Sequence, residues 1–243
     1  MMKESIREEI EDFVLSYHDQ HSTVTVWGSP IVGFASASDP MFNLLKSAVS
    51  ESHAMPAELL HNARTVVAFF LPFTEETAGT NIGGGTPSPE WDKAWTEAWK
   101  LMHDLYLHME SFLKAGGHES VIMPSRHKLD LDKLISDWSD RHIAVIAGLG
   151  RFGLNNMLIT EKGCCGRVGS FVMSAGVEPD PQRHHEACLY RYNGECMKCT
   201  ERCVNNALLA DKFDRHKCAE HHCGKCLVGL PCSHVDPVQK VNA

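Results

Sequence analysis

Apolar residues recur at two spacings along the first three quarters of the chain, and each spacing predicts a different kind of element. Intervals of three and four residues predict amphipathic helices over residues 3–17 and 89–115. Alternating or continuously apolar runs predict strands at residues 24–27, 31–35, 65–70 and 168–174. Residues 132–146 have a mostly helical pattern. This mixture predicts an α+β fold.

The second helix carries a stripe of large apolar residues, which are Trp95, Trp99, Met102, Tyr106 and Met109. A stripe at this spacing is typical of a helix that packs on a core, so we interpret it as core rather than as a cofactor contact.

Glycine and proline mark the breaks between elements. Residues 79–89 contain four glycines and two prolines, which predicts a loop. The sequence VEPDP at residues 177–181 predicts an extended linker, after which cysteine becomes frequent. We therefore expect two domains, an α+β domain over residues 1–181 and a small cysteine-rich domain over residues 182–243.

Composition and charge narrow the classes of function. An apolar fraction of 43% can supply a core, and a formal net charge of −8 argues against broad binding of phosphate backbones. No apolar run reaches the roughly 18 residues of a membrane span. The charged N-terminal sequence lacks the apolar stretch of a secretory signal, so we expect a cytoplasmic protein.

The chain has ten cysteines, and eight of them lie between Cys188 and Cys232. In a reducing compartment, clustered thiols more often bind metal than form disulfides. Two-cluster ferredoxins take three ligands from Cys-x2-Cys-x2-Cys and a fourth from a Cys-Pro pair that serves the other cluster. Cys196, Cys199 and Cys203 match the last three positions of that run, but Asn193 occupies the first position and Val204 replaces the proline.

The eight cysteines divide into two sets of four if the crossed pattern of ferredoxins applies. One predicted 4Fe–4S cluster then has the ligands Cys188, Cys196, Cys199 and Cys232. The other has the ligands Cys203, Cys218, Cys223 and Cys226.

A structural zinc ion is the main alternative. Cys196-x2-Cys199 and Cys223-x2-Cys226 together have the spacing of a ribbon-type tetrahedral site, as in an interaction module. That interpretation gives no role to the other four cysteines of the segment.

A glycine-punctuated turn, AGLGRFGLNNMLIT, occupies residues 147–160. A dinucleotide-binding turn would follow a strand and open a helix, whereas this one follows a helical pattern and feeds a strand. The sequence therefore argues against a nucleotide site here.

The order of motifs resembles that of epoxyqueuosine reductases, which are relatives of the corrinoid-dependent reductive dehalogenases. The resemblance rests on the glycine turn, RVGSFVMS at residues 167–174, VEPDP and the cysteine segment, and is specific from about Asp140 to Cys232. It is weaker near the N-terminus, where it rests on VGFAS at residues 32–36 and TVVAFFLPF at residues 65–73.

The resemblance implies a nitroreductase-like cobalamin-binding domain followed by a ferredoxin-like domain with two 4Fe–4S clusters. It implies a base-off cobalamin that receives electrons from a low-potential donor protein through the clusters. By position, the corrin would lie against Arg141, Gly148, Leu149, Gly150, Phe152, Gly153 and Asn155.

Two departures from the family suggest a different substrate. Leu134 stands where the family has its proton-donating aspartate, so Asp132 and Asp137 are the nearest candidates. The sequence also ends soon after Cys232, before the helical repeats that help to hold tRNA in the family. We therefore expect a small-molecule substrate rather than tRNA.

An electron-transfer protein that reduces a partner corrinoid protein is the alternative function. The adjacent pair Cys164 and Cys165 is interpreted as buried and structural, with a redox thiol as the second interpretation.

Overall fold

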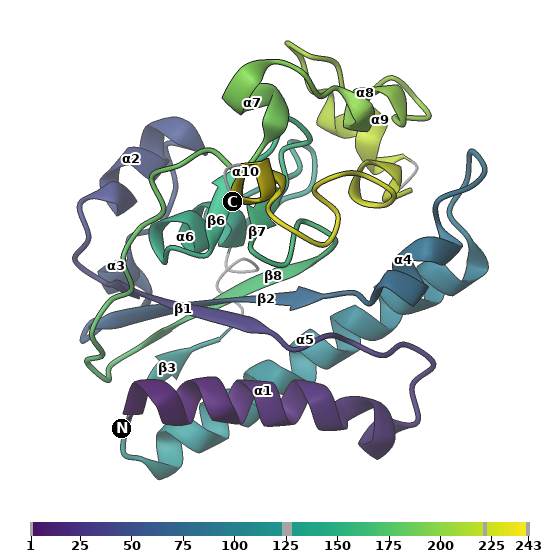
Figure 1. The fold of residues 1–243 in the computed structure, drawn as a ribbon. Coiled ribbons are helices and arrows are strands. Elements are labelled where there is room, and N and C mark those ends of the chain that lie inside the picture. Colours follow the sequence, from purple (N-terminus) through teal and green to yellow (C-terminus); the bar gives the residue numbers. More distant parts are fainter. Residues whose placement is uncertain (1, 123–127, 221–222, 242–243) are drawn as a thin grey trace.

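The body of the protein is built on an antiparallel sheet of four strands in the order β1-β2-β8-β3, as seen in a computed structural model that describes residues 2–122, 128–220 and 223–241 (Figure 1). The strands are β1 (Ile31–Ser36), β2 (Thr65–Pro72), β8 (Gly166–Met173) and β3 (Ser120–Val121). All eight residues of β2 are buried, because layers cover this central strand on both faces. The predicted strands at residues 31–35, 65–70 and 168–174 are thus confirmed.

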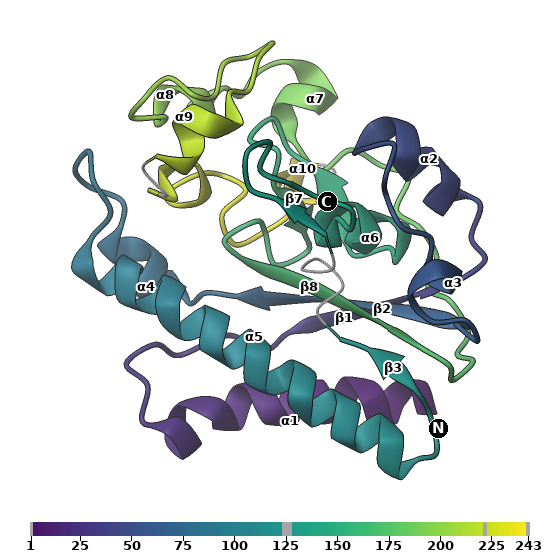
Figure 2. The same cartoon turned by 180° about the vertical axis from the view of Figure 1, so that it is seen from behind.

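The side chains of β2 alternate between two apolar cores. Its odd-numbered residues from 67 to 71 pack with α1 (Met2–His21) and α5 (Pro89–Ala115). Its even-numbered residues from 66 to 70 pack with α2 (Met41–Ala48) and α6 (Asp140–Ile146). Figures 1 and 2 show α1 and α5 together under the sheet and α6 above it. The expected α+β class is therefore confirmed.

Helix α5 has clear sequence signals at both ends. The Ser88 hydroxyl accepts a hydrogen bond from the Trp91 amide at 3.1 Å, Pro89 opens the first turn, and Gly116 follows the last residue. Met102, Tyr106 and Met109 of the predicted stripe are buried as expected.

Two sequence predictions are wrong in this part of the chain. Residues 24–27 form no strand and contribute only an isolated bridge between Trp27 and Phe73. Helix α6 starts only at Asp140, and the residues before it form the hairpin β4 (Leu129–Asp130) and β5 (Ile135–Ser136). Ser139 disfavours a longer helix because it adopts extended backbone angles.

The glycine turn forms a second hairpin, and short helices complete the fold. The hairpin pairs β6 (Gly150–Phe152) with β7 (Leu158–Thr160), so the predicted strand after the turn is confirmed. The remaining elements are α3 (Pro56–Leu59), α4 (Glu75–Thr80), α7 (Leu189–Asn193), α8 (Lys198–Glu201), α9 (Arg215–Ala219), η2 (Lys225–Leu227) and α10 (Pro237–Val241).

The cysteine segment packs on the side of the molecule that carries α6, β6 and β7 (Figures 1 and 2). Its apolar residues Leu208, Leu227, Val228 and Leu230 belong to the same core as α1 and α5. The Cys164 amide donates to the Cys232 carbonyl at 2.8 Å, and the Cys165 amide donates to the Ser233 carbonyl at 2.9 Å. These contacts fix the segment against the start of β8.

Candidate functional site

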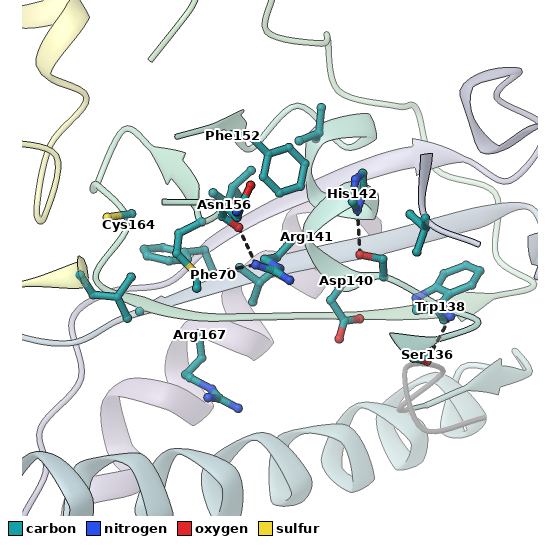
Figure 3. A pocket seen from close by; sticks show the side chains of 18 of the residues that line it. Phe70, Ser136, Trp138, Asp140, Arg141, His142, Phe152, Asn156, Cys164 and Arg167 are labelled. Atoms are coloured by element: carbon teal, nitrogen blue, oxygen red, sulfur yellow. Dashed lines mark hydrogen bonds between the residues drawn. The ribbon is translucent and has the colours of Figure 1, made fainter. Parts of the chain in front are cut away.

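A cavity of about 1070 Å³ lies between α5, α6, the β6–β7 hairpin and the cysteine segment (Figure 3). Strand β3 pairs only with Val172 and Met173 of β8, which leaves the first half of β8 beside this cavity. The volume is at the upper end of the roughly 300–1,000 Å³ that is typical of small-molecule sites. The cavity therefore has room for a large ligand.

Aromatic and sulfur-containing side chains form much of the cavity wall. They include Phe70, Trp95, Trp99, Met102, Tyr106, Trp138, Phe152, Met157 and Cys164. Trp99 keeps 44% of its surface exposed, so the core interpretation of the α5 stripe is wrong for this residue. Trp95 is partly buried and packs against the core, and it also lines the cavity. The stripe turns from core to cavity wall toward the N-terminal end of the helix.

Arg141 projects from α6 into the middle of this site (Figure 3). Its guanidinium donates to the Asn156 carbonyl and, at 3.8 Å, to the Met157 sulfur. Burial lowers the pKa of Arg141, while the neighbouring Asp140 carboxylate acts in the opposite direction. These bonds hold the β6–β7 hairpin against α6.

His142 also lines the cavity, and its ring lies 4.6 Å from that of Phe152 between centroids. Its Nδ1 atom is 2.8 Å from the Ser139 hydroxyl. Burial, followed by the charge of Arg141 and by His53, lowers the pKa of His142 to about 4. The imidazole is therefore neutral at pH 7.

Arg167 enters the cavity from β8 and stacks on two tryptophans of α5. Its guanidinium carbon lies 4.0 Å from the ring centroid of Trp95 and 4.2 Å from that of Trp99. Burial lowers the pKa of Arg167 to about 10, so this side chain remains charged at pH 7.

Most of the electrostatic interactions among the cysteine thiols fall within the two predicted sets of four, which remain a prediction. Burial, and then the thiols of Cys232, Cys188 and Cys196, raise the pKa of Cys199 to about 12. In the second group, burial and the thiols of Cys223 and Cys203 raise the pKa of Cys218. Burial, followed by the thiols of Cys218, Cys223, Cys199 and Cys203, raises the pKa of Cys226, so Cys199 of the first set also acts on the second.

Cys164 connects the first of these groups with the cavity. It lines the cavity wall, and its thiol donates to the sulfur of Cys232 at 3.9 Å. That bond, followed by burial, raises the pKa of Cys232. Cys165 is buried as well, and burial raises its pKa to about 12. Both thiols of the adjacent pair belong to the same core, and Cys164 also lines the cavity.

Most of the glycine turn faces protein rather than the cavity. A Cβ atom on Gly148 would lie 2.3 Å from the Pro181 carbonyl oxygen, and one on Gly150 would lie 2.2 Å from that of Ile159. Leu149 is buried in the core around α6, and a Cβ on Gly153 would meet the Asn155 side chain at 2.6 Å. Close packing of the chain on itself therefore requires these glycines.

Other predicted site residues divide between the cavity and its surroundings. Arg141 and Phe152 line the cavity, whereas the Asn155 side chain turns toward the cysteine segment and donates to the Cys226 carbonyl at 2.8 Å. Asp132 is exposed, and the buried Asp137 accepts a hydrogen bond from the Lys128 amide at 3.0 Å. Neither aspartate belongs to the described cavity wall.

Sequence reasoning missed three of the polar residues that the structure brings to this cavity, which are Asp140, His142 and Arg167. The alternation in β8 offered a signal for one of them. Arg167 shares a strand face with Gly169 and Phe171, and that face packs toward α5.

In the described part of the chain, no three side chains of the His, Cys, Asp or Glu type lie close enough together to hold one metal ion. Within the same residues, no helix has both the length and the apolar composition needed to cross a membrane.

The fold is shared with two groups of solved structures. An epoxyqueuosine reductase from Streptococcus thermophilus aligns with 88% of this chain at a TM-score of 0.53 and 17% identity. An epoxyqueuosine reductase solved with an epoxyqueuosine-modified tRNA-Tyr stem loop aligns with 89% of this chain at a TM-score of 0.54 and 20% identity. A reductive dehalogenase, whose structure suggests a mechanism for B12-dependent dehalogenation, aligns with 86% of this chain at a TM-score of 0.60 and 17% identity.

These matches confirm the predicted resemblance at the level of the fold. No protein-family model and no curated protein sequence matches the chain. The chain spans 55% and 56% of the two epoxyqueuosine reductases and 30% of the dehalogenase.

Proposed function

We propose that this protein is an iron–sulfur oxidoreductase that passes electrons through two 4Fe–4S clusters to a corrinoid in the large cavity, where a small substrate is reduced. The contact between Cys164 and Cys232 is the observation that carries this proposal. It joins a predicted cluster ligand to the wall of the cavity at a sulfur–sulfur distance of 3.9 Å.

The donor set fits the two clusters. Burial and mutual repulsion raise the pKa values of Cys199, Cys218 and Cys226, so these thiols favour the protonated form without a cation. An iron–sulfur core supplies the positive charge that stabilises four thiolates together. Cubane clusters also separate their cysteine sulfurs more widely than a single ion does.

The zinc alternative receives less support from the same thiols. A ribbon-type site needs Cys196 and Cys199 to share one ion with Cys223 and Cys226. The thiols that act on Cys199 are those of Cys232, Cys188 and Cys196, although Cys199 in turn raises the pKa of Cys226. Those that act on Cys218 are Cys223 and Cys203.

The cavity fits a large cofactor that has an apolar ring face and polar edges. Its volume of about 1070 Å³ and its aromatic wall suit a macrocycle, and Arg141, Phe152 and Met157 are placed to hold one. A bound corrinoid would supply low-valent cobalt, a strong reductant that side chains cannot provide. The protein would orient the substrate and exclude water around it.

Proton transfer is better placed at the cavity wall than at the two aspartates predicted from sequence. His142 lines the cavity and is neutral at pH 7, with its ring fixed by Ser139. Asp140 lines it too, and its carboxylate accepts a hydrogen bond from the Ser170 hydroxyl at 2.6 Å. Replacing each of these residues, with Asp132 and Asp137 as comparisons, tests which of them moves protons.

The proposal is tested on protein purified without oxygen. We expect close to eight irons per chain, since each cubane holds four. We also expect an absorbance change when cobalamin is added at up to tens of micromolar, a range typical of weakly held cofactors. Stoichiometric zinc with little iron would refute the cluster assignment.

The corrinoid titration also separates the two candidate functions. Clusters without corrinoid binding would favour an electron-transfer protein that reduces a partner corrinoid protein. Epoxyqueuosine-containing tRNA serves as a second substrate in the activity assay, and we expect little turnover of it because the chain has a net charge of −8.

A further inference from the structure

The charge of the cavity wall is opposite to that of the whole chain. The formal net charge of the protein is −8, yet the wall contains the five arginines Arg141, Arg151, Arg167, Arg191 and Arg215. Its acidic side chains are Asp140 and Glu186. A low-dielectric cavity lined by one sign of charge concentrates ligands of the other sign.

Arg151 and Arg141 each have a partner within the protein. Arg151 forms an ion pair with the Glu186 carboxylate at 3.9 Å, and Arg141 donates a hydrogen bond to the Asn156 carbonyl. These two side chains contribute charge to the cavity, but each already interacts with a neighbouring group.

Arg167 has a different environment. Its flat guanidinium lies against the faces of Trp95 and Trp99 at 4.0 and 4.2 Å. Among the described residues, no carboxylate lies within 4.0 Å of Arg167 as an ion-pair partner. Stacking fixes the plane of a guanidinium while its N–H groups remain directed outward along the edge.

The energetics of Arg167 favour a bound anion. Burial disfavours its charge, and among the described residues the carboxylate that offsets this effect is that of Asp140, which also accepts a hydrogen bond from Ser170. A buried charge without a close counter-ion is costly, and an oxyanion at its edge would remove that cost. The planar fork of arginine matches a carboxylate or a phosphate with two parallel hydrogen bonds.

We propose that Arg167, held flat by Trp95 and Trp99, is the oxyanion-binding group of this cavity and selects an anionic ligand. This inference rests on the proposed function in that it takes the cavity to be the reaction site. The shared chemistry is a carboxylate or phosphate group. It can belong to the substrate or to the phosphodiester of the nucleotide tail of a corrinoid.

Anion binding is measured by calorimetry on the anaerobically purified protein, with benzoate and inorganic phosphate as probes at constant ionic strength. Tryptophan fluorescence provides a second readout, because Trp95 and Trp99 contact the guanidinium directly. We expect Arg167→Gln to weaken binding about tenfold or more, the usual effect of losing a charge-assisted hydrogen bond.

Arg151→Gln is the matched control, because it removes the same charge from the same cavity wall. We expect it to change binding by less than about threefold, since only the screened field of the wall changes. Arg167→Lys should retain part of the affinity, because it keeps the charge and loses the planar fork. Iron content and circular dichroism establish that all variants fold.

The affinities of the protein for cobalamin and for cobinamide, which lacks the nucleotide phosphate, show whether the bound anionic group belongs to the cofactor or to the substrate. A preference for cobalamin that disappears in Arg167→Gln assigns the site to the cofactor. Equal affinities for the two corrinoids, together with binding of benzoate or phosphate, assign the oxyanion site to the substrate. Probe binding without any corrinoid binding would defeat the proposed function but support the oxyanion site.

Two outcomes would overturn the inference. One is an equal loss of probe affinity in Arg151→Gln and Arg167→Gln, which would show a diffuse field instead of a site. The other is the absence of probe binding at millimolar concentrations combined with equal corrinoid affinity in wild type and Arg167→Gln.

Discussion

The body of the protein and its cysteine segment are stabilised in different ways. The body has helices of 20 and 27 residues and a central strand that is buried along its whole length. The helices of the segment are four or five residues long, and neither α7 nor α9 has a buried residue. Helices this short are not stable by themselves.

This difference indicates which part of the chain depends on a cofactor. Apolar burial can hold the body together, since two cores cover the faces of its sheet. The segment instead surrounds eight thiols, and several of them are buried with like groups around them. Metal binding supplies folding free energy to segments of this kind.

Removal of the clusters should have the largest effect of the changes considered. The loss of amide protection should be confined to the cysteine segment. We expect a chelator with a mild oxidant to abolish amide protection across residues 188–232, because the short helices lose the centres that tie them together. Strands β2 and β8 should keep their protection. Hydrogen exchange with mass spectrometry measures both regions in one experiment, and unchanged protection of the segment would contradict the comparison.

Single cysteine substitutions sharpen the comparison within the segment. Cys199→Ser and Cys226→Ser should each remove about four irons, because each is assigned to a different cubane. Spectroscopy of the remaining centre should differ between the two variants. Cys165→Ala is the control, since Cys165 is buried away from the cavity and should leave the iron content unchanged. Loss of the same centre in both serine variants would refute the crossed assignment.

The sequence predicted the elements whose burial has a regular period. Residues 3–17 and 89–115 show such a period and form helices, while residues 65–70 are predicted by a continuous apolar run and form a strand that is buried throughout. The run at 132–146 was misread because Leu134, Ile135 and Trp138 are apolar at helical intervals but line the cavity from a hairpin and the turn that follows it. A periodic apolar pattern indicates which residues pack against other apolar groups, but it does not identify the element or cavity that they face.

The candidate site was predictable only in part, for a related reason. The spacing of the cysteines, together with the crossed pattern of ferredoxins, predicts two groups of four ligands. It could not tell whether the glycine turn faces a cofactor or the chain itself, and Gly148 and Gly150 in fact pack on Pro181 and Ile159. Trp95, Trp99 and Arg167 meet only when α5 and β8 are packed together.

Glycine substitutions in the body should have an intermediate effect. Gly150→Ala places a Cβ 2.2 Å from the Ile159 carbonyl oxygen, so the β6–β7 hairpin must shift. We expect a loss of about 3 kcal/mol in the free energy of unfolding, at the upper end for overpacking. Gly79→Ala is the control, because Gly79 lies in α4 with no atom within 4 Å of the added Cβ, and it should be neutral or slightly stabilising.

Denaturant unfolding of the body can be followed separately from that of the segment. All five tryptophans lie within residues 1–181, so their fluorescence reports chiefly on the body, although Trp91 packs against Gly224 of the segment. Equal midpoints for Gly150→Ala and Gly79→Ala would show that the turn tolerates side chains and that its glycines serve a ligand instead.

The smallest expected effect is a pH dependence of the free energy of unfolding that originates from His142 in the cavity wall. Burial, Arg141 and His53 lower the pKa of His142 to about 4 in the folded protein, whereas the ordinary histidine value is about 6.5. Between these values the unfolded chain binds a proton that the folded chain does not bind. The contribution of His142 to stability is therefore complete above pH 6.5 and is lost as the pH falls toward 4. Because solvent reaches the cavity, we expect a loss of about 1 kcal/mol between pH 7 and pH 5.

His142→Asn cannot take up this proton, so the difference in unfolding free energy between wild type and variant should shrink by that amount at pH 5. The other histidines contribute to both proteins and largely cancel in the difference. A difference that stays constant from pH 7 to pH 5 would show that His142 is solvated like a surface histidine, and that the cavity wall is wetter than its aromatic lining implies.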